Sequence, residues 1–167
     1  MRLPEFQRGI VWNGDQVLAL IDSAERGFPI GLLMIWEAAD GQAYVIDGQQ
    51  RFTALTGRRP GEAVNTWSVY FDIDAQAWTL HKPDRGIPLW IDDFASEIAL
   101  WRTLGDFGDP AIEAAVRRRE AVHQCWNFPT YVLRRATPTE VIDVFLRVNS
   151  GGTAPDPSFL RWVRDSF

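Results

Sequence analysis

The spacing of apolar residues predicts a helix and then a strand hairpin near the start of the chain. Apolar residues recur every three to four positions from Val17 to Ala24, which is the pattern of a helix with one buried face. Asn13 precedes this stretch and Gln16 follows three positions later, an arrangement typical of a capping box at a helix start. The apolar runs IGLLMIWE and AYVID then lie on either side of Asp40-Gly41, so we expect two strands joined by a tight turn.

The rest of the chain changes between strand and helix without a regular alternation. TWSVYFDID alternates apolar and polar positions, and AWTLHKPDRGIPLWID continues the antiparallel pattern across a Pro-Asp-Arg-Gly turn. Asp109-Pro110 predicts the start of a helix that runs towards His123, and FPTYVLRR predicts another strand. Thr137 and Glu140 form a capping box before a last helix. Because this order contains no internal repeat and no regular strand-helix alternation, it predicts an α+β fold.

Length and composition set limits on this picture. A chain of 167 residues suits a single domain that covers residues 1–167. No apolar run is long enough to span a membrane, no signal peptide is visible, and the single cysteine, Cys125, fits a reducing compartment. We therefore expect a cytoplasmic protein that does not enter a membrane.

The charge balance gives no general attraction to nucleic acid. The 17 basic and 22 acidic residues leave a net charge of −5. The dense basic spots, at 117–119 and at Arg134-Arg135, are interpreted as solvated surface. Any contact with DNA must then be local.

The stretch YVIDGQQRFTALTG is the first candidate for chemistry, because it begins like a strand and continues as a helix from Gln49. The first turn of a helix exposes unpaired N–H groups at the positive end of the helix dipole, where phosphate binds well. Gly48 permits close backbone approach, Arg51 offers a charged fork to phosphate oxygens, and Asp47 is able to hold Mg²⁺ or orient a water. The amides of Gln49 and Gln50 are suited to positioning an attacking water.

A purely structural interpretation accounts for the same residues. Asp47 would cap the helix, Gly48 would relieve the turn, and Arg51 would pair with a surface acid. A capped strand-to-helix turn is common and lacks the specificity of a Walker loop. Spacing alone leaves both interpretations open.

Two further stretches favour anion binding. Asn149-Ser150-Gly151-Gly152-Thr153 follows the last predicted helix. One left-handed glycine would suffice to stop that helix, whereas two glycines flanked by Asn, Ser and Thr also suit a concave nest of N–H groups. Gln7 and Arg8 lie in an extended segment after Pro4. We predict that the stretches 47–51 and 149–153 face one pocket.

Together these stretches resemble the N-terminal domain of GmrSD-type modification-dependent restriction enzymes, also called the DGQQR domain. The resemblance implies a ParB/sulfiredoxin-like fold, here with an inserted antiparallel β hairpin and helices. The matching motifs span nearly the whole chain: Pro4-Glu5-Phe6-Gln7-Arg8, Pro29-Ile30-Gly31, Val45-Ile46-Asp47-Gly48-Gln49-Gln50-Arg51 and Phe145-Leu146-Arg147-Val148-Asn149-Ser150-Gly151-Gly152-Thr153.

The same resemblance implies a nucleotide-binding and nucleotide-hydrolysing sensor module in a bacterial anti-phage system that acts on modified DNA. Such a module would use Mg²⁺ with ATP, GTP or CTP and would regulate an HNH nuclease domain or subunit. The implied catalytic residues are Asp47, Gln49 and Gln50, with Asp47 also on the metal. The implied nucleotide-binding residues are Gln7, Arg8, Gly48, Arg51, Asn149, Ser150, Gly151, Gly152 and Thr153.

The chain also departs from the family pattern. Ala154-Pro155-Asp156-Pro157 stands where the family continues with a leucine-serine pair, and only Met1-Arg2-Leu3 precedes the Gln-Arg segment. We therefore expect a domain truncated at one or both ends, with weakened nucleotide binding or absent hydrolysis. His81 and His123 lack partner motifs, so we expect no HNH nuclease domain in this chain.

A different class of function stays open beside the nucleotide-hydrolysing module. The alternative is a non-catalytic domain that recognises DNA or a partner protein, because a ParB-like fold is compatible with both roles. Homo-oligomerisation is compatible with either. Nucleotide hydrolysis distinguishes the two classes.

Overall fold

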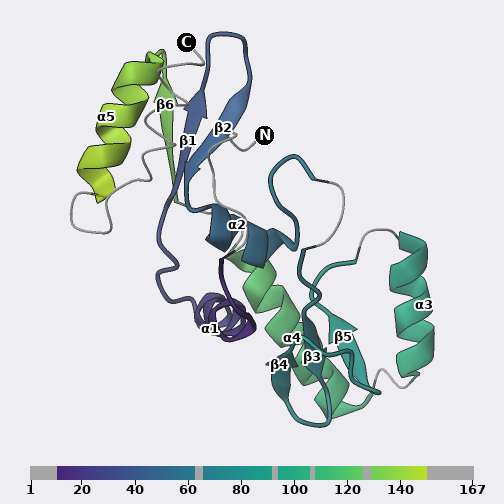
Figure 1. Cartoon of the computed structure of the whole chain (residues 1–167). Helices are drawn as coiled ribbons and strands as arrows, with labels where there is room; N and C mark the ends of the chain where they lie inside the picture. Colours follow the sequence, from purple (N-terminus) through teal and green to yellow (C-terminus); the bar gives the residue numbers. More distant parts are fainter. Residues whose placement is uncertain (1–10, 63–65, 92–93, 106–107, 126–128, 150–167) are drawn as a thin grey trace. The chain divides into compact units, whose positions relative to one another are not determined.

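The computed structural model describes residues 11–62, 66–91, 94–105, 108–125 and 129–149 (Figure 1). These residues contain five helices and six strands, which confirms the mixed α+β class. They form two units, each with its own internal contacts. The first unit takes the described residues of Met1–Val11, Gly31–Gln50 and Phe128–Phe167, and the second those of Trp12–Ile30 and Arg51–Asn127.

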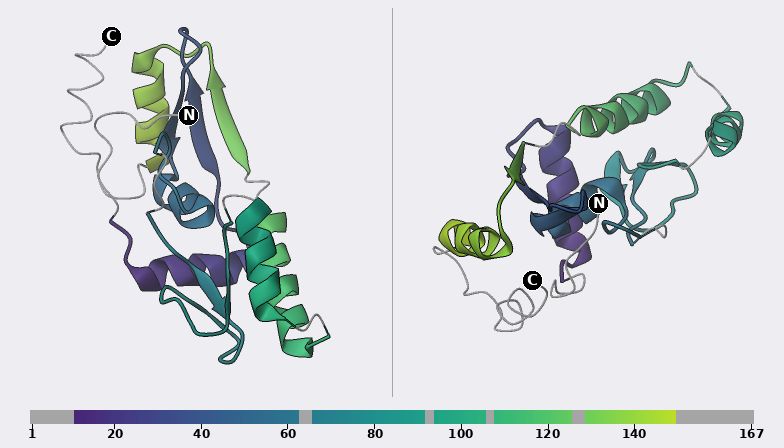
Figure 2. Two further views of the ribbon diagram at one scale, coloured as in Figure 1. Left: turned by 90° about the vertical axis from the view of Figure 1, so that its right-hand side faces the viewer. Right: turned by 90° about the horizontal axis from the view of Figure 1, so that it is seen from above.

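A three-stranded sheet forms the centre of the first unit. Strand β1 (Leu33–Glu37) pairs antiparallel with β2 (Ala43–Asp47) and parallel with β6 (Thr130–Arg134), so the order is β2-β1-β6. Helix α5 (Pro138–Asn149) lies along this sheet (Figures 1 and 2). The core between them consists of Met34, Trp36, Ile46, Leu133 and Val141.

The hairpin of β1 and β2 contains a bulge close to its open end. Met34 pairs with Asp47 and Ile35 pairs with Val45, which leaves Ile46 as an extra residue in β2. Val45 and Ile46 are both buried although they are consecutive, a departure from the alternation of a regular strand. A bulge permits this because it bends the strand and increases its local twist.

The second unit combines a small antiparallel sheet with helices. Strand β3 (Tyr70–Asp72) lies between β4 (Ala77–Thr79) and β5 (Gly86–Pro88). The core is formed by apolar residues of this sheet and of the helix that covers it: Phe71, Ile73, Ile87, Ile112 and Ala115. The helices are α1 (Gly14–Glu25), α3 (Phe94–Leu104) and α4 (Pro110–Gln124), and α4 packs against both α1 and β3.

Helix α2 (Gln49–Thr56) joins the two units covalently, because its first two residues belong to the first unit and the rest to the second. It begins after Gly48 and ends before Gly57, and both glycines have positive φ, of 90° and 75°. In the second unit, the indole N–H of Trp90 donates to the carbonyl of Leu55 at 2.8 Å and holds the ring beside the end of the helix.

The predicted helix starts are confirmed. The side chain of Asn13 accepts from the N–H of Gln16, and the side chain of Gln16 accepts in turn from the N–H of Asn13. Asp109 accepts from the N–H of Ala111 at the start of α4. Local capping signals thus located these helices correctly.

Other predictions need correction. The sequence pattern did not predict α3. Strands β4 and β5 do not pair with each other across the Pro-Asp-Arg-Gly turn, because each pairs antiparallel with β3, which lies between them. The interpretation of Arg119 as solvated surface is wrong, because its side chain is only 14% exposed and donates to the carbonyl of Leu89. The side chain of Arg118 stays 43% exposed, although it also lies over the ring of Phe71 at 5.3 Å.

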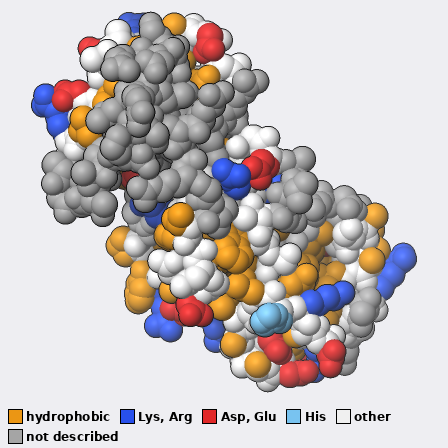
Figure 3. Space-filling model, viewed as in Figure 1, with side chains coloured by type: hydrophobic (Ala, Val, Ile, Leu, Met, Phe, Trp, Pro, Cys, Tyr) orange, Lys and Arg blue, Asp and Glu red, His pale blue; other side chains and the backbone are white. Residues whose placement is uncertain are grey.

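The described surface mixes both signs of charge. On the face in Figure 3, basic and acidic side chains are interspersed between apolar ones. Among the described residues, no helix has the length and apolar character needed to cross a membrane.

Candidate functional site

The segment from Asp47 to Arg51 is a strand-to-helix turn, as predicted. Strand β2 ends at Asp47, and α2 begins at Gln49. Gly48 alone connects them and is buried, with a φ of 90°. A residue with a side chain rarely adopts this backbone conformation, so glycine is required for so abrupt a turn.

The bulge at Ile46 determines where this turn starts. The extra residue shifts the phase of β2 by one position, so that Val45 and Ile46 both reach the core. Asp47, the next residue, is half-buried and pairs in register with Met34 at the end of β1. The sheet therefore fixes the backbone position of Asp47 relative to the helix start.

The geometry weakens the interpretation of Asp47 as a simple helix cap. A capping side chain belongs to the residue directly before the helix, where it accepts from the second or third helical N–H. Gly48 holds that position and has no side chain. Asp47 is one residue further away, within the strand.

Gln49 is the most unusual side chain of the segment. It is only 7% exposed, and its amide nitrogen has no hydrogen-bond partner among the described residues. One turn further along α2, the hydroxyl of Thr53 is fully buried and also lacks a partner among them. Residues four apart share one face of a helix. A buried polar atom without a partner costs about 1–3 kcal/mol, and native proteins therefore keep few of them.

The neighbouring side chains are less buried. Gln50 and Arg51 are both half-buried. The side-chain oxygen of Gln50 accepts from the N–H of Val11 at 3.4 Å, which connects the start of α2 with the first described residue of the chain.

Several predicted site residues lie outside the described part of the chain. These are Gln7, Arg8, Ser150, Gly151, Gly152 and Thr153. Asn149 is the last residue of α5, and only its backbone is described. The prediction that the stretches 47–51 and 149–153 face one pocket therefore stays a prediction.

The metal assignment of Asp47 also stays a prediction. Within the described ranges, no group of three or more His, Cys, Asp or Glu side chains is arranged to hold a metal ion. A Mg²⁺ that is bound through a nucleotide needs only one or two protein carboxylates, because phosphate oxygens and waters supply the other ligands.

The sequence pattern missed a cavity at the other end of the first unit. It lies beside the β1–β2 turn and the connection from β6 to α5, and its lining includes Trp36 and Arg135. The basic pair Arg134-Arg135, which lines the cavity, could be seen in the sequence. Without knowledge that β6 pairs with β1, however, nothing placed this pair next to a tryptophan.

Comparison with known proteins supports the motif-based assignment. The sequence profile of the GmrSD restriction endonuclease N-terminal domain matches residues 1–161. The chain belongs to this family. No curated protein and no solved structure gives a significant match to the chain. The family assignment therefore places this GmrSD N-terminal domain in a restriction system.

Proposed function

We propose that this GmrSD N-terminal domain binds a nucleoside triphosphate at the start of α2 and, by binding and hydrolysing it, regulates a DNA-cleaving nuclease. The observation that carries the proposal is the buried amide of Gln49, whose nitrogen has no partner among the described residues. A buried donor needs an acceptor, and the oxygens of a phosphate or sugar are acceptors.

Three features of the turn favour an anionic ligand. The first N–H groups of α2 have no acceptor within the helix, and the helix dipole adds partial positive charge there. Gly48 lets a ligand approach the backbone closely. Arg51 supplies a permanent charge with a planar fork of donors that suits phosphate. Together they support a phosphate site at the helix start.

The roles of the site residues follow from their chemistry. Asp47, fixed at the end of β2, would hold Mg²⁺, which supplies charge stabilisation to the phosphates when bound. Gln50 and Gln49 would orient a water for attack on the terminal phosphate, because an amide both donates and accepts hydrogen bonds. Gln7, Arg8 and the stretch from Asn149 to Thr153 would complete the binding of the nucleotide.

The proposal extends to fold and partners. The first unit would be the ParB/sulfiredoxin-like part of the domain, with the second unit inserted into it. The nuclease would be an HNH domain or subunit, and modified DNA would be the target of the complete cytoplasmic system. The family assignment to a restriction endonuclease supports this part.

The direct test is a calorimetric titration of the chain with ATP, GTP and CTP, each with and without Mg²⁺, followed by a phosphate-release assay. Binding of at least one nucleotide is expected. Two variants locate the site. Arg51→Ala should lose a charge-assisted contact of about 1.5–3 kcal/mol, hence roughly ten- to a hundredfold in affinity. Gln49→Leu should also weaken binding, yet leave the ligand-free protein at least as stable, because it removes a buried donor without a partner.

Arg117→Ala is the matched control, because Arg117 is exposed and, among the described residues, pairs with Glu113 one helical turn away. It should bind nucleotide like the wild type. If Arg51→Ala lowered the melting temperature together with affinity, Arg51 would be a structural residue. If the chain bound none of the three nucleotides, the proposed function would be refuted.

Asp47→Asn separates the metal role from a structural one. The change keeps the size of the side chain and one accepting oxygen but removes the negative charge that Mg²⁺ prefers. We expect near wild-type stability and loss of the Mg²⁺-dependent part of binding or hydrolysis. An unchanged Mg²⁺ titration would show that Asp47 does not hold the metal.

A further inference from the structure

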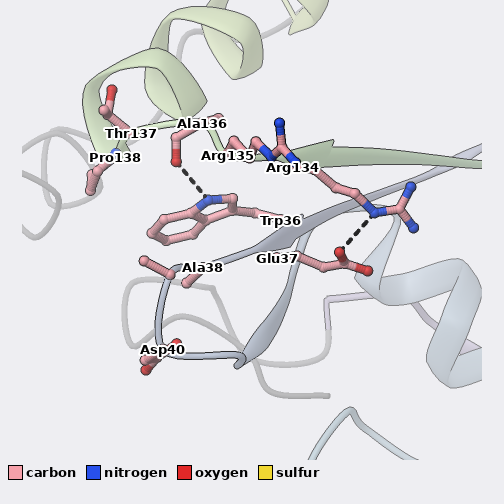
Figure 4. Close-up of a pocket in the computed structure, with 10 residues that line it drawn as sticks. Trp36, Glu37, Ala38, Asp40, Arg134, Arg135, Ala136, Thr137 and Pro138 are labelled. Atoms are coloured by element: carbon pink, nitrogen blue, oxygen red, sulfur yellow. Dashed lines mark hydrogen bonds and ion pairs between the residues drawn. The ribbon is translucent and has the colours of Figure 1, made fainter.

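A cavity of about 780 Å³ lies at the end of the β2-β1-β6 sheet that is remote from Asp47 (Figure 4). The described residues of its lining come from two segments: the end of β1 with the turn that follows it, and the end of β6 with the connection to α5. This volume is in the range of pockets that bind small organic ligands.

The walls of the cavity are mostly apolar and firmly held. Ala38, Ala136 and Pro138 line it together with Trp36. The indole N–H of Trp36 donates to the carbonyl of Ala136 at 3.1 Å and so ties β1 to the connection after β6. The ring of Tyr44 packs beside Trp36, with 5.6 Å between the ring centroids. A pocket with fixed walls loses little conformational freedom when a ligand binds.

Four of the described residues that line the cavity are charged, and one of them, Asp40, accepts a hydrogen bond from the backbone N–H of Gln42 at 2.9 Å. Arg134 pairs with Glu37 at 2.8 Å, and Figure 4 shows this pair beside the cavity. Arg135 is exposed and has no ion pair or hydrogen bond with any side chain in the described part of the chain. The cavity therefore combines an apolar body with a guanidinium group that is able to receive an anion.

The backbone of Arg135 is a second unusual feature. Its φ is 59°, in the left-handed region where residues other than glycine, asparagine and aspartate are uncommon. An arginine here costs more than a glycine would, by about 1 kcal/mol. Strained residues of this kind are concentrated at functional sites, where the side chain is needed despite its cost.

We propose that this cavity binds a nucleotide unit, with the base against the apolar walls and the phosphate on Arg135. A nucleotide joins a flat, largely apolar ring to an anion, which is the combination that the cavity and Arg135 accept. The family is one of restriction endonucleases, so nucleic acid is a natural source of such a unit. The other source is a free mononucleotide.

This site is separate from the one at the start of α2. Along the β1–β2 hairpin, Asp47 pairs with Met34, whereas Trp36 pairs with Tyr44 towards the opposite end. Because a strand rises about 3.3 Å per residue, the three steps from Tyr44 to Asp47 along β2 place these residues roughly 10 Å apart. The cavity site does not rest on the nucleotide hydrolysis proposed for α2. The two sites can be tested separately, because a different arginine is substituted to weaken binding at each.

The test follows the indole N–H signal of Trp36 by NMR in the ¹⁵N-labelled chain, assigned through its contacts with Ala136. Deoxyadenosine monophosphate is titrated in parallel with deoxyadenosine and with inorganic phosphate, at millimolar concentrations. The signal should shift with the monophosphate at lower concentration than with either fragment. A short single-stranded oligonucleotide forms a further arm: tighter binding of the oligonucleotide assigns the unit to a strand, and tighter binding of the monophosphate assigns it to a free nucleotide.

Arg135→Gly is the decisive variant, because glycine adopts the left-handed backbone without strain, so the guanidinium is lost together with its side chain but no strain is added. The variant should keep or raise the melting temperature and lower the affinity for the monophosphate roughly tenfold or more. Arg51→Ala and Arg117→Ala should leave the Trp36 response unchanged. The inference is overturned if the Trp36 signal does not respond to any nucleotide, if phosphate alone gives the same response, or if Arg135→Gly binds like the wild type.

Discussion

Helices α5 and α2 begin in opposite ways. At the start of α5, Glu140 accepts from both the N–H and the hydroxyl of Thr137, at 2.7 and 2.8 Å, and the hydroxyl accepts from the N–H of Glu140. At the start of α2, the preceding residue is Gly48, and the first side chain, Gln49, is buried with an amide nitrogen that lacks a partner among the described residues. The chain caps the start of α5 with its own side chains, whereas at the start of α2 the amide nitrogen of Gln49 finds no partner in the described part of the chain.

This difference supports the proposal that the start of α2 serves binding, whereas the start of α5 serves stability. A capping box contributes to folding whether or not a ligand is present. A buried donor without a partner has the opposite effect on stability, so its retention favours a role with a ligand. The predictions below test this comparison, beginning with the largest expected effect.

Replacing Gly57 should show that the end of α2, like its start at Gly48, requires a glycine. In Gly57→Ala the new methyl group would meet the ring of Trp90 at 2.8 Å, in addition to the strain of a φ of 75°. Because Trp90 is held by its hydrogen bond to Leu55, we expect a loss of roughly 2–4 kcal/mol in the free energy of unfolding. Urea unfolding measures it.

Gly27→Ala is the control for strain without overlap. Gly27 follows α1 with a φ of 67° and has open space where the methyl group would be. The substitution Gly27→Ala should lower the free energy of unfolding by only about 1–2 kcal/mol. Equal losses at the two glycines would mean that Trp90 yields easily and that the end of α2 is not fixed by close packing.

A matched pair of threonines tests the contrast itself. Thr53→Val in α2 replaces a fully buried hydroxyl that has no partner among the described residues, so stability should rise by about 1 kcal/mol. Thr137→Val removes the hydroxyl that caps α5, so stability should fall by about 1 kcal/mol. Urea midpoints of the two variants should therefore move in opposite directions. A loss of stability in Thr53→Val would show that its hydroxyl is satisfied in solution and would remove the contrast.

The smallest effect concerns pH. Hydrogen bonds from the backbone N–H of Thr137, and then from its hydroxyl, hold the pKa of Glu140 below its ordinary value of 4.5. A carboxylate with a lowered pKa in the folded state stabilises the protein above its unfolded pKa, and that contribution is lost as the pH falls through the folded value. Stability should thus decline as the medium is acidified below about pH 4.5.

Glu140→Gln isolates this contribution, because glutamine keeps the capping box but does not titrate. Unfolding of the variant, measured by urea at neutral pH and at about pH 3, should lose less stability on acidification than the wild type. The pKa of Asp109 is also lowered, by the N–H of Ala111 and by Arg85, so part of the acid sensitivity should persist in both proteins. Identical pH dependence would mean that the Thr137–Glu140 interaction does not persist in solution.

Sequence patterns predicted the features that depend on neighbouring residues. Capping at Asn13, Asp109 and Thr137 uses side chains within three positions, and the change from strand to helix around Gly48 depends on one glycine. The motif-based family assignment is confirmed by the match over residues 1–161. The catalytic and nucleotide-binding roles remain predictions.

Features that depend on distant pairing could not be read in this way. The parallel pairing of β1 with β6 brings Trp36 and Ala136 together although they are 100 positions apart. The order β4-β3-β5 and the cavity beside Arg135 also arise only after such pairing. Ile46 gave no local sign of a bulge, because an apolar residue in an apolar run fits a regular strand equally well.

The pairing of β1 with β6 has a consequence for synthesis of the chain. β1 leaves the ribosome long before β6, and the whole segment Arg51–Asn127 of the second unit is made between them. Since a chain emerges from its N-terminus at about 5–20 residues per second, β1 and β2 wait for several seconds or more as an incomplete sheet. During this interval the edge of β1 that later receives β6 has unpaired backbone groups, and a strand edge of that kind attracts other chains. The second unit can begin to fold in the meantime, whereas the cavity at Trp36 is completed only after β6 has been made.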